Sequence, residues 1–121
     1  MNREYDESAE LTHYVWHNYS QLAEDWERHA MRGFAAREKS IAADEPQRRL
    51  LAKWSASDDP RVIAALQLPP AEFRRRTAVR IVEDHPNEAI VNRCPQCDRI
   101  VRTPAAQQCF WCGHDWHAVS R

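Results

Sequence analysis

The chain has 121 residues, a formal net charge of −1 and a mean hydropathy of −0.76, with 29% charged residues. These values favour one soluble domain, or a domain with a small appendage, and no apolar run approaches the roughly 20 residues that a membrane-spanning helix needs. The stretch MNREYDESAEL is acidic and polar, unlike the basic and apolar start of a secretion signal, so a cytoplasmic location is expected.

The first third of the sequence predicts a long helix. From about Ser8 to Ile41 the apolar residues recur at helical spacing, and only two glycines occur in the whole chain. Gly33 lies within this stretch, where it either breaks the helix or admits a crossing helix. We interpret the aromatic stripe as core rather than as a cofactor site or partner groove. The stripe consists of Trp16, Tyr19, Trp26 and Phe34.

Three shorter helices are predicted from their start signals. The first begins with Asp44 as the cap, Pro46 as an early proline and Gln47 as the capping-box partner. This helix carries Leu50, Leu51 and Trp54. Asp59-Pro60 starts a second helix, and Pro69-Pro70 opens a third that ends near Asp84. Residues 1–88 are therefore expected to form a helical module of three to four helices.

The composition changes from Ala89 onward. All four cysteines of the chain lie here, in two Cys-x-x-Cys pairs with eleven residues between them, and they are Cys94, Cys97, Cys109 and Cys112. The two residues inside each pair let the chain turn back so that both sulfurs meet one ion. The stretches AIVNRC, RIVRT and HDWHAV are predicted to be strands around the pairs. Gly113 and Asp98 each follow a pair, where a positive φ is often needed.

Cys94-Pro95-Gln96-Cys97 and Cys109-Phe110-Trp111-Cys112-Gly113 resemble the knuckles of zinc ribbons in their four-cysteine form. The resemblance covers roughly residues 89–117 and extends to small bacterial proteins with a C-terminal ribbon. It implies a three-stranded ribbon with one structural Zn²⁺ ion bound by all four cysteines. Rubredoxin has similar knuckles and holds iron, but a much longer span separates them, so zinc is preferred. The predicted fold is mainly α, with a helical module over 1–88 and a small β zinc ribbon over 89–121.

Four cysteine ligands leave no open position on the ion, which favours a structural site over a catalytic one. Two metal-free pairs, reduced or disulfide-bonded, are the alternative. His114 and His117 could replace a cysteine as ligand. His13 and His17 are spaced i, i+4 like a helical metal site, but HYVWH lacks the glutamate of the HExxH motif, so we interpret them as interfacial histidines.

Arg74, Arg75, Arg76 and Arg80 form the candidate contact for an anion or a nucleic acid. Three consecutive arginines spread around a helix rather than along one face, which favours a solvated surface. We expect a non-enzymatic protein that acts in protein–protein interaction or as an adaptor, with a protein partner or a second copy of itself. The alternative is a nucleic-acid-binding or regulatory protein that uses these arginines and the ribbon. A zinc enzyme would need a second metal at His13, His17 or His29.

Overall fold

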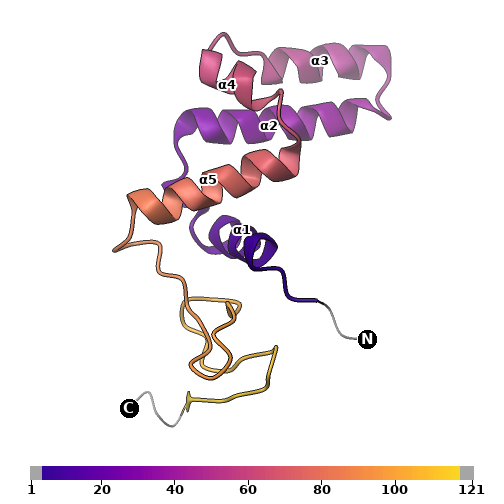
Figure 1. Cartoon of the computed structure of the whole chain (residues 1–121). Coiled ribbons are helices and arrows are strands. Elements are labelled where there is room, and N and C mark those ends of the chain that lie inside the picture. The colour runs from indigo at the N-terminus through magenta and orange to yellow at the C-terminus, as the bar shows by residue number, and fades with distance from the viewer. Residues whose placement is uncertain (1–3, 118–121) are drawn as a thin grey trace. The chain divides into compact units, whose positions relative to one another are not determined.

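The computed structural model describes residues 4–117, apart from the side chains at positions 54 and 55. This part of the chain contains five α-helices and one 3-10 turn, in the order α1 (Glu7–Asn18), η1 (Ser20–Leu22), α2 (Asp25–Ser40), α3 (Glu45–Ser55), α4 (Pro60–Ala65) and α5 (Pro70–Asp84) (Figure 1). None of these helices is both long and apolar enough to cross a bilayer.

The chain divides into two compact units. The first comprises the residues up to Leu22 together with those from Arg74 onward, and the second comprises Ala23–Phe73. The first helix therefore belongs to the same unit as all four cysteines. A separate folding boundary near residue 88 stays a prediction.

The expected single helix over Ser8–Ile41 is wrong. Helix α1 ends at Asn18, and α2 begins only at Asp25. A capping box starts α2, because the Glu27 carboxylate accepts the Glu24 N–H at 2.7 Å and the Glu24 side chain accepts the N–H of Glu27. Such a box satisfies backbone donors that have no partner within a helix, so it fixes a new start. The break precedes Gly33, which lies inside α2.

The other predicted helix starts are confirmed. The Asp44 carboxylate accepts the N–H of Gln47 at 2.9 Å, and the Gln47 side chain accepts the N–H of Asp44 at 3.3 Å. Asp59 caps α4 by accepting the N–H of Arg61 at 2.8 Å. These signals act between neighbours in sequence, and α5 likewise starts at a proline, Pro70.

The second unit is organised around α2. Helix α3 runs back alongside α2, and α4 packs on it as well (Figure 1). The buried cluster contains Ala30, Phe34, Val62, Ala65 and Phe73. Two large apolar residues of this unit lie at the surface, since Leu50 is 45% exposed and Ile41 is 80% exposed. Apolar surface thus remains at the α2–α3 end of this unit.

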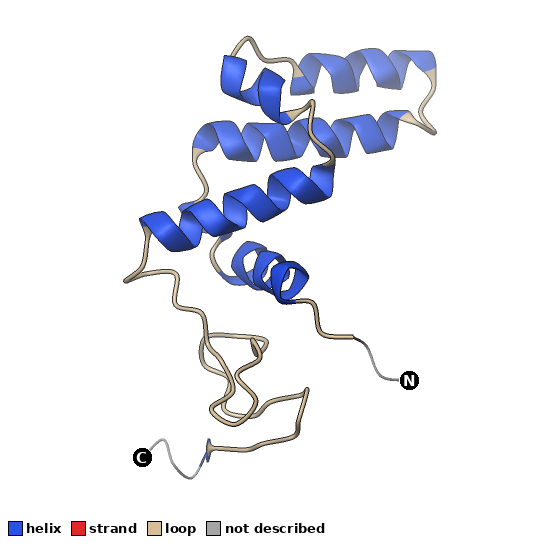
Figure 2. Cartoon of the chain, viewed as in Figure 1, coloured by secondary structure: helices blue, strands red, loops and turns tan. Residues whose placement is uncertain are grey.

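The predicted three-stranded ribbon is wrong. In the part of the chain that the structure describes there is no strand, and the cysteine segment shows two isolated antiparallel bridges, Arg93–Ile100 and Gln108–Asp115 (Figure 2). The end of the third expected strand lies outside the described residues. The Tyr14 hydroxyl of α1 bonds two backbone groups of the first expected strand, the carbonyl of Ile90 and the N–H of Asn92, while the carbonyl of Asn92 accepts the N–H of Val101 at 3.1 Å.

Gly33 packs closely against the end of α4, which agrees with the prediction that it admits a crossing helix. A Cβ atom at this position would lie 2.9 Å from Cδ2 of Leu66. Alanine is expected to be tolerated, because the end of the Leu66 side chain can move. Gly33→Leu should lower the free energy of unfolding by about 1–3 kcal/mol through overpacking. Urea unfolding measures this change, and Ala35→Leu, at an exposed site on the same helix, should be near neutral.

Candidate metal centre

The first Cys-x-x-Cys pair forms a tight knuckle. The N–H of Cys94 donates to the carbonyl of Arg99 at 2.9 Å, and the N–H of Asp98 donates back to the carbonyl of Cys94 at 2.9 Å. Asp98 has a φ of 63°, in the left-handed region that aspartate tolerates better than most residues. The chain therefore reverses directly after Cys97, as the sequence predicted.

The second pair repeats this geometry. The N–H of Cys109 donates to the carbonyl of His114 at 2.8 Å, and the N–H of Gly113 donates to the carbonyl of Cys109 at 2.8 Å. Gly113 has a φ of 81°, which glycine adopts without steric cost. Both knuckles thus have the same pattern of hydrogen bonds, and each presents two sulfurs.

The four sulfurs converge on one point. All of them lie within 4.8 Å of one another, and the pairs Cys94–Cys112 and Cys97–Cys109 are each 3.6 Å apart. Metal–sulfur bonds of about 2.3 Å in a tetrahedron place sulfurs about 3.8 Å apart. The spacing therefore matches a tetrahedral ion held by all four cysteines, and the cysteine cluster is compatible with metal binding.

Backbone amides surround the sulfurs. The N–H groups of Gln96 and Cys97 point at the sulfur of Cys94, at 3.3 and 3.4 Å, and the N–H of Cys112 points at the sulfur of Cys109 at 3.4 Å. Such donors stabilise negative charge on sulfur. They also offset part of the repulsion between thiolates that share one ion.

The thiol pKa values diverge within the cluster. Burial works to raise the pKa of Cys94, but hydrogen bonds from the Cys97 and Gln96 amides and from the Cys112 thiol outweigh it and lower this pKa to about 7. Burial, with the neighbouring sulfurs, raises the pKa of Cys97 to about 12. Without a cation, therefore, the sulfurs cannot all carry negative charge at neutral pH. A divalent ion removes this conflict.

Helix α1 holds the segment that leads into the cysteines. The buried hydroxyl of Tyr14 donates to the carbonyl of Ile90 at 2.6 Å and accepts the N–H of Asn92 at 3.2 Å. The Asn92 side chain then donates to the carbonyls of Thr103 and Ala106, at 3.0 and 2.9 Å. Tyr14 thus holds the backbone at Asn92, and the Asn92 side chain in turn holds the loop between the knuckles.

Further contacts of α1 and the residues before it reach both knuckles and the loop between them. Asn18 donates to the carbonyl of Arg102 at 3.2 Å, and Glu7 forms an ion pair with Arg93. The ring of Tyr5 meets that of Trp111 edge-on, with centroids 5.0 Å apart. The sequence reasoning missed these residues. The only sequence signal for such contacts was a polar residue within an apolar stretch, as at Asn92.

The structure separates the other candidate ligands from the cysteines. His114 stacks on Trp116, with ring centroids 5.8 Å apart, and His117 contacts Asp115 at 2.5 Å. Trp116 packs on the buried cluster of Cys94, Val101 and Cys109. Within the described residues, the cysteines are the only set of three or more ligating side chains that lie within 4.8 Å of one another.

The arginines of α5 do not share one environment. Arg74 is half-buried, and its carbonyl accepts the indole N–H of Trp16 at 3.0 Å. Arg75 and Arg76 are exposed, while Arg80 pairs with Asp84 at 3.0 Å. Anion or nucleic-acid contact by these four arginines stays a prediction.

Comparison of the chain with models of known protein families, with curated proteins and with solved structures finds no match.

Tyr14→Phe should destabilise the first unit. It leaves the carbonyl of Ile90 with one hydroxyl partner fewer and the N–H of Asn92 without its acceptor, so the free energy of unfolding should fall by about 1–3 kcal/mol. Chemical denaturation followed by near-UV circular dichroism measures this. Tyr19→Phe is the matched control, because Tyr19 reaches the same carbonyl at 3.1 Å from a less buried position. An equal effect of both substitutions would contradict the special role of Tyr14.

The same tyrosine predicts a pH dependence. Burial, the largest cause, raises the pKa of Tyr14 to about 12 from an ordinary value of 10.0. The folded chain therefore holds this proton more tightly than the unfolded chain. The Tyr14 contribution is fully present below pH 10 and is lost as the pH rises toward 12. The difference in unfolding free energy between wild type and Tyr14→Phe should shrink over that window, and a constant difference would contradict the assignment.

Proposed function

We propose that Cys94, Cys97, Cys109 and Cys112 hold one Zn²⁺ ion in a closed structural site, and that the chain acts as a non-enzymatic interaction module. The observation that carries the proposal is the convergence of four sulfurs from two equivalent knuckles within 4.8 Å. When bound, the ion supplies a cross-link between the knuckles. The proposal places the protein in a reducing compartment, where these thiols remain available as ligands.

Zinc is favoured by the ligand set. Four thiolates in a tetrahedron suit Zn²⁺ or iron, whereas oxygen-preferring ions such as Mg²⁺ or Ca²⁺ avoid sulfur. Zn²⁺ has no redox chemistry and accepts the tetrahedral arrangement without a preference of its own. The short loop of eleven residues between the knuckles also favours zinc over a rubredoxin-like iron site.

A structural role follows from the coordination number. Four protein ligands leave no position for water or substrate, which a catalytic zinc normally keeps. The surrounding residues support the four sulfurs: backbone amides donate to the sulfurs, and Asp98 and Gly113, in the left-handed region, close the turns. Binding free energy would then supply the order that a strandless segment cannot obtain from its small core.

Exposed apolar side chains support an interaction role. Ile90 is 51% exposed and Phe110 is 44% exposed, both in the first unit. Aromatic side chains such as Phe110 are enriched in protein–protein interfaces relative to the rest of the surface. The proposed partner is therefore another protein or a second copy of the chain.

Metal analysis tests the first half of the proposal. Purified protein should contain one zinc per chain and lack the visible absorption of an iron–thiolate site. Cys94→Ser and Cys109→Ser should each lose the metal, because one ligand of four is removed, and near-UV circular dichroism should show disorder of the cysteine segment. Gln96→Ala is the matched control, since its exposed side chain leaves the backbone donor to Cys94 in place.

Several outcomes would contradict this interpretation. Full zinc content in both serine variants would show that the cysteines are not the ligands. Iron in the purified protein would show that the metal is not zinc. For the interaction role, Phe110→Ser should reduce self-association in light scattering, or capture of a partner from the native host, while zinc content stays at one. Binding to single-stranded or duplex nucleic acid that weakens steeply with salt would favour the nucleic-acid alternative instead.

A further inference from the structure

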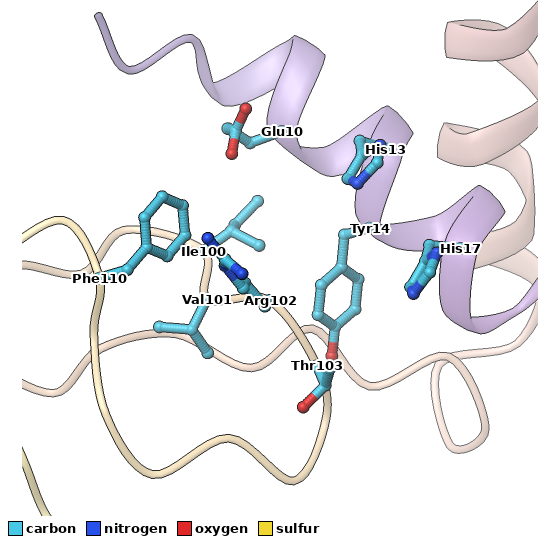
Figure 3. Close-up of a pocket in the computed structure, with 9 residues that line it drawn as sticks. All are labelled: Glu10, His13, Tyr14, His17, Ile100, Val101, Arg102, Thr103 and Phe110. Carbon is cyan, nitrogen blue, oxygen red and sulfur yellow. The ribbon is translucent and has the colours of Figure 1, made fainter. Parts of the chain in front are cut away.

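His13 and His17 lie on one face of α1 and line a cleft of about 470 Å³ within the first unit (Figure 3). The opposite wall consists of residues 100–103 and Phe110. This cleft is separate from the cysteine centre, because none of the four cysteines lines it. The two histidines therefore form a second group of metal-ligating side chains that the proposed function does not use.

The two imidazoles are arranged side by side. Their ring centroids are 5.8 Å apart and their planes differ by 11°. This separation is close to the rise of four helical residues, about 6 Å, so the helix itself sets the spacing. Both side chains are exposed, and among the described residues neither imidazole has a hydrogen-bond or ion-pair partner. The ring nitrogens are thus available to a ligand.

We propose that His13 and His17 together bind one divalent first-row transition ion, independently of the cysteine centre. Neutral imidazole suits Zn²⁺, Ni²⁺ and Cu²⁺. Bonds of about 2.0–2.1 Å to one nitrogen of each ring need those nitrogens within about 4 Å of each other, so the rings tilt together on binding. Exposed side chains rotate on the picosecond to nanosecond timescale, which makes this adjustment easy.

The electrostatic surroundings favour a cation over an anion at this pair. His17 lies in the last turn of α1, where the helix macrodipole places partial negative charge. Glu10 lines the same wall one turn before His13. Across the cleft, the Arg102 guanidinium opposes a cation, but it lies 4.7 Å from the centre of the Phe110 ring, which offers it a separate stabilising contact.

The site differs in kind from the cysteine quartet. Among the described residues, His13, His17 and Glu10 do not form a set of three ligating groups that all lie within 4.8 Å of one another, so we assign Glu10 a contribution of charge rather than a bond. Two imidazoles leave at least half of the coordination positions of the ion to water. The bound ion is therefore exchangeable and open to a further ligand in the cleft, whereas four thiolates close their ion off.

The test is equilibrium dialysis of the full chain, loaded with zinc, against Ni²⁺. Wild type should bind one Ni²⁺ beyond its zinc, and the ring-proton resonances of His13 and His17 should broaden. His13→Ala and His17→Ala should each weaken Ni²⁺ binding by roughly a hundredfold, because the loss of one ligand removes the gain from two linked ligands. His117→Ala, which removes another exposed histidine of the first unit, should bind Ni²⁺ like wild type.

Both alanine variants replace exposed residues, so circular dichroism should show an unchanged fold. Undiminished Ni²⁺ binding in either variant would overturn the proposal. The proposal would also be overturned if wild type bound no Ni²⁺ beyond its zinc. It would be overturned as well if Ni²⁺ displaced zinc and gave nickel–thiolate absorption, because the ion would then be bound by the cysteines and not by the histidines. If the purified chain carried no zinc, only the proposal for the cysteine site would fail. The comparison of Ni²⁺ binding between wild type, His13→Ala and His17→Ala would still test the histidine site.

Discussion

Four sulfurs held within 4.8 Å of one another constrain the whole cysteine segment. Residues 85–117 contain no strand and no α-helix, and their buried cluster centres on Cys94, Val101 and Cys109. Two of the three cluster members are therefore themselves candidate ligands. Because close thiolates repel one another, the order of this segment depends on the cation or protons that neutralise them. The candidate metal site and the buried core of the segment therefore share the same cysteines.

Helix α1 provides the second constraint on the first unit. Its Tyr14 hydroxyl bonds two backbone groups ahead of Cys94, and its Asn18 side chain bonds the carbonyl of Arg102. Buried polar groups need such partners, since an unpaired one costs about 1–3 kcal/mol. The face of the helix that carries Tyr14 also presents His13 and His17 to the cleft. One short helix thus both supports the knuckles and carries the two histidines of the second proposed site.

The two proposed ion sites differ in the type and number of their ligands. Four thiolates give a closed and slowly exchanging site, suited to holding a chain together. Two imidazoles on a helix surface give an open site that responds to the free ion concentration. The pair and the quartet share the first unit, yet none of the cysteines lines the cleft of the histidines. Occupation of one is therefore expected to be separable from occupation of the other.

The sequence by itself determined the features that depend on near neighbours. The cap at Asp44 and the left-handed turns at Asp98 and Gly113 follow from residues a few positions apart, whereas the close sulfur pairs Cys94–Cys112 and Cys97–Cys109 join the two knuckles. Tertiary structure alone decided that no ribbon of strands forms among the described residues. The carbonyl of Ile90 and the N–H of Asn92 are bonded by Tyr14, 76 and 78 residues away in sequence, and the neighbouring segment bonds only the carbonyl of Asn92, through the N–H of Val101. Hydrogen bonds over such separations leave no periodic signal, because periodicity records only which face of an element is buried.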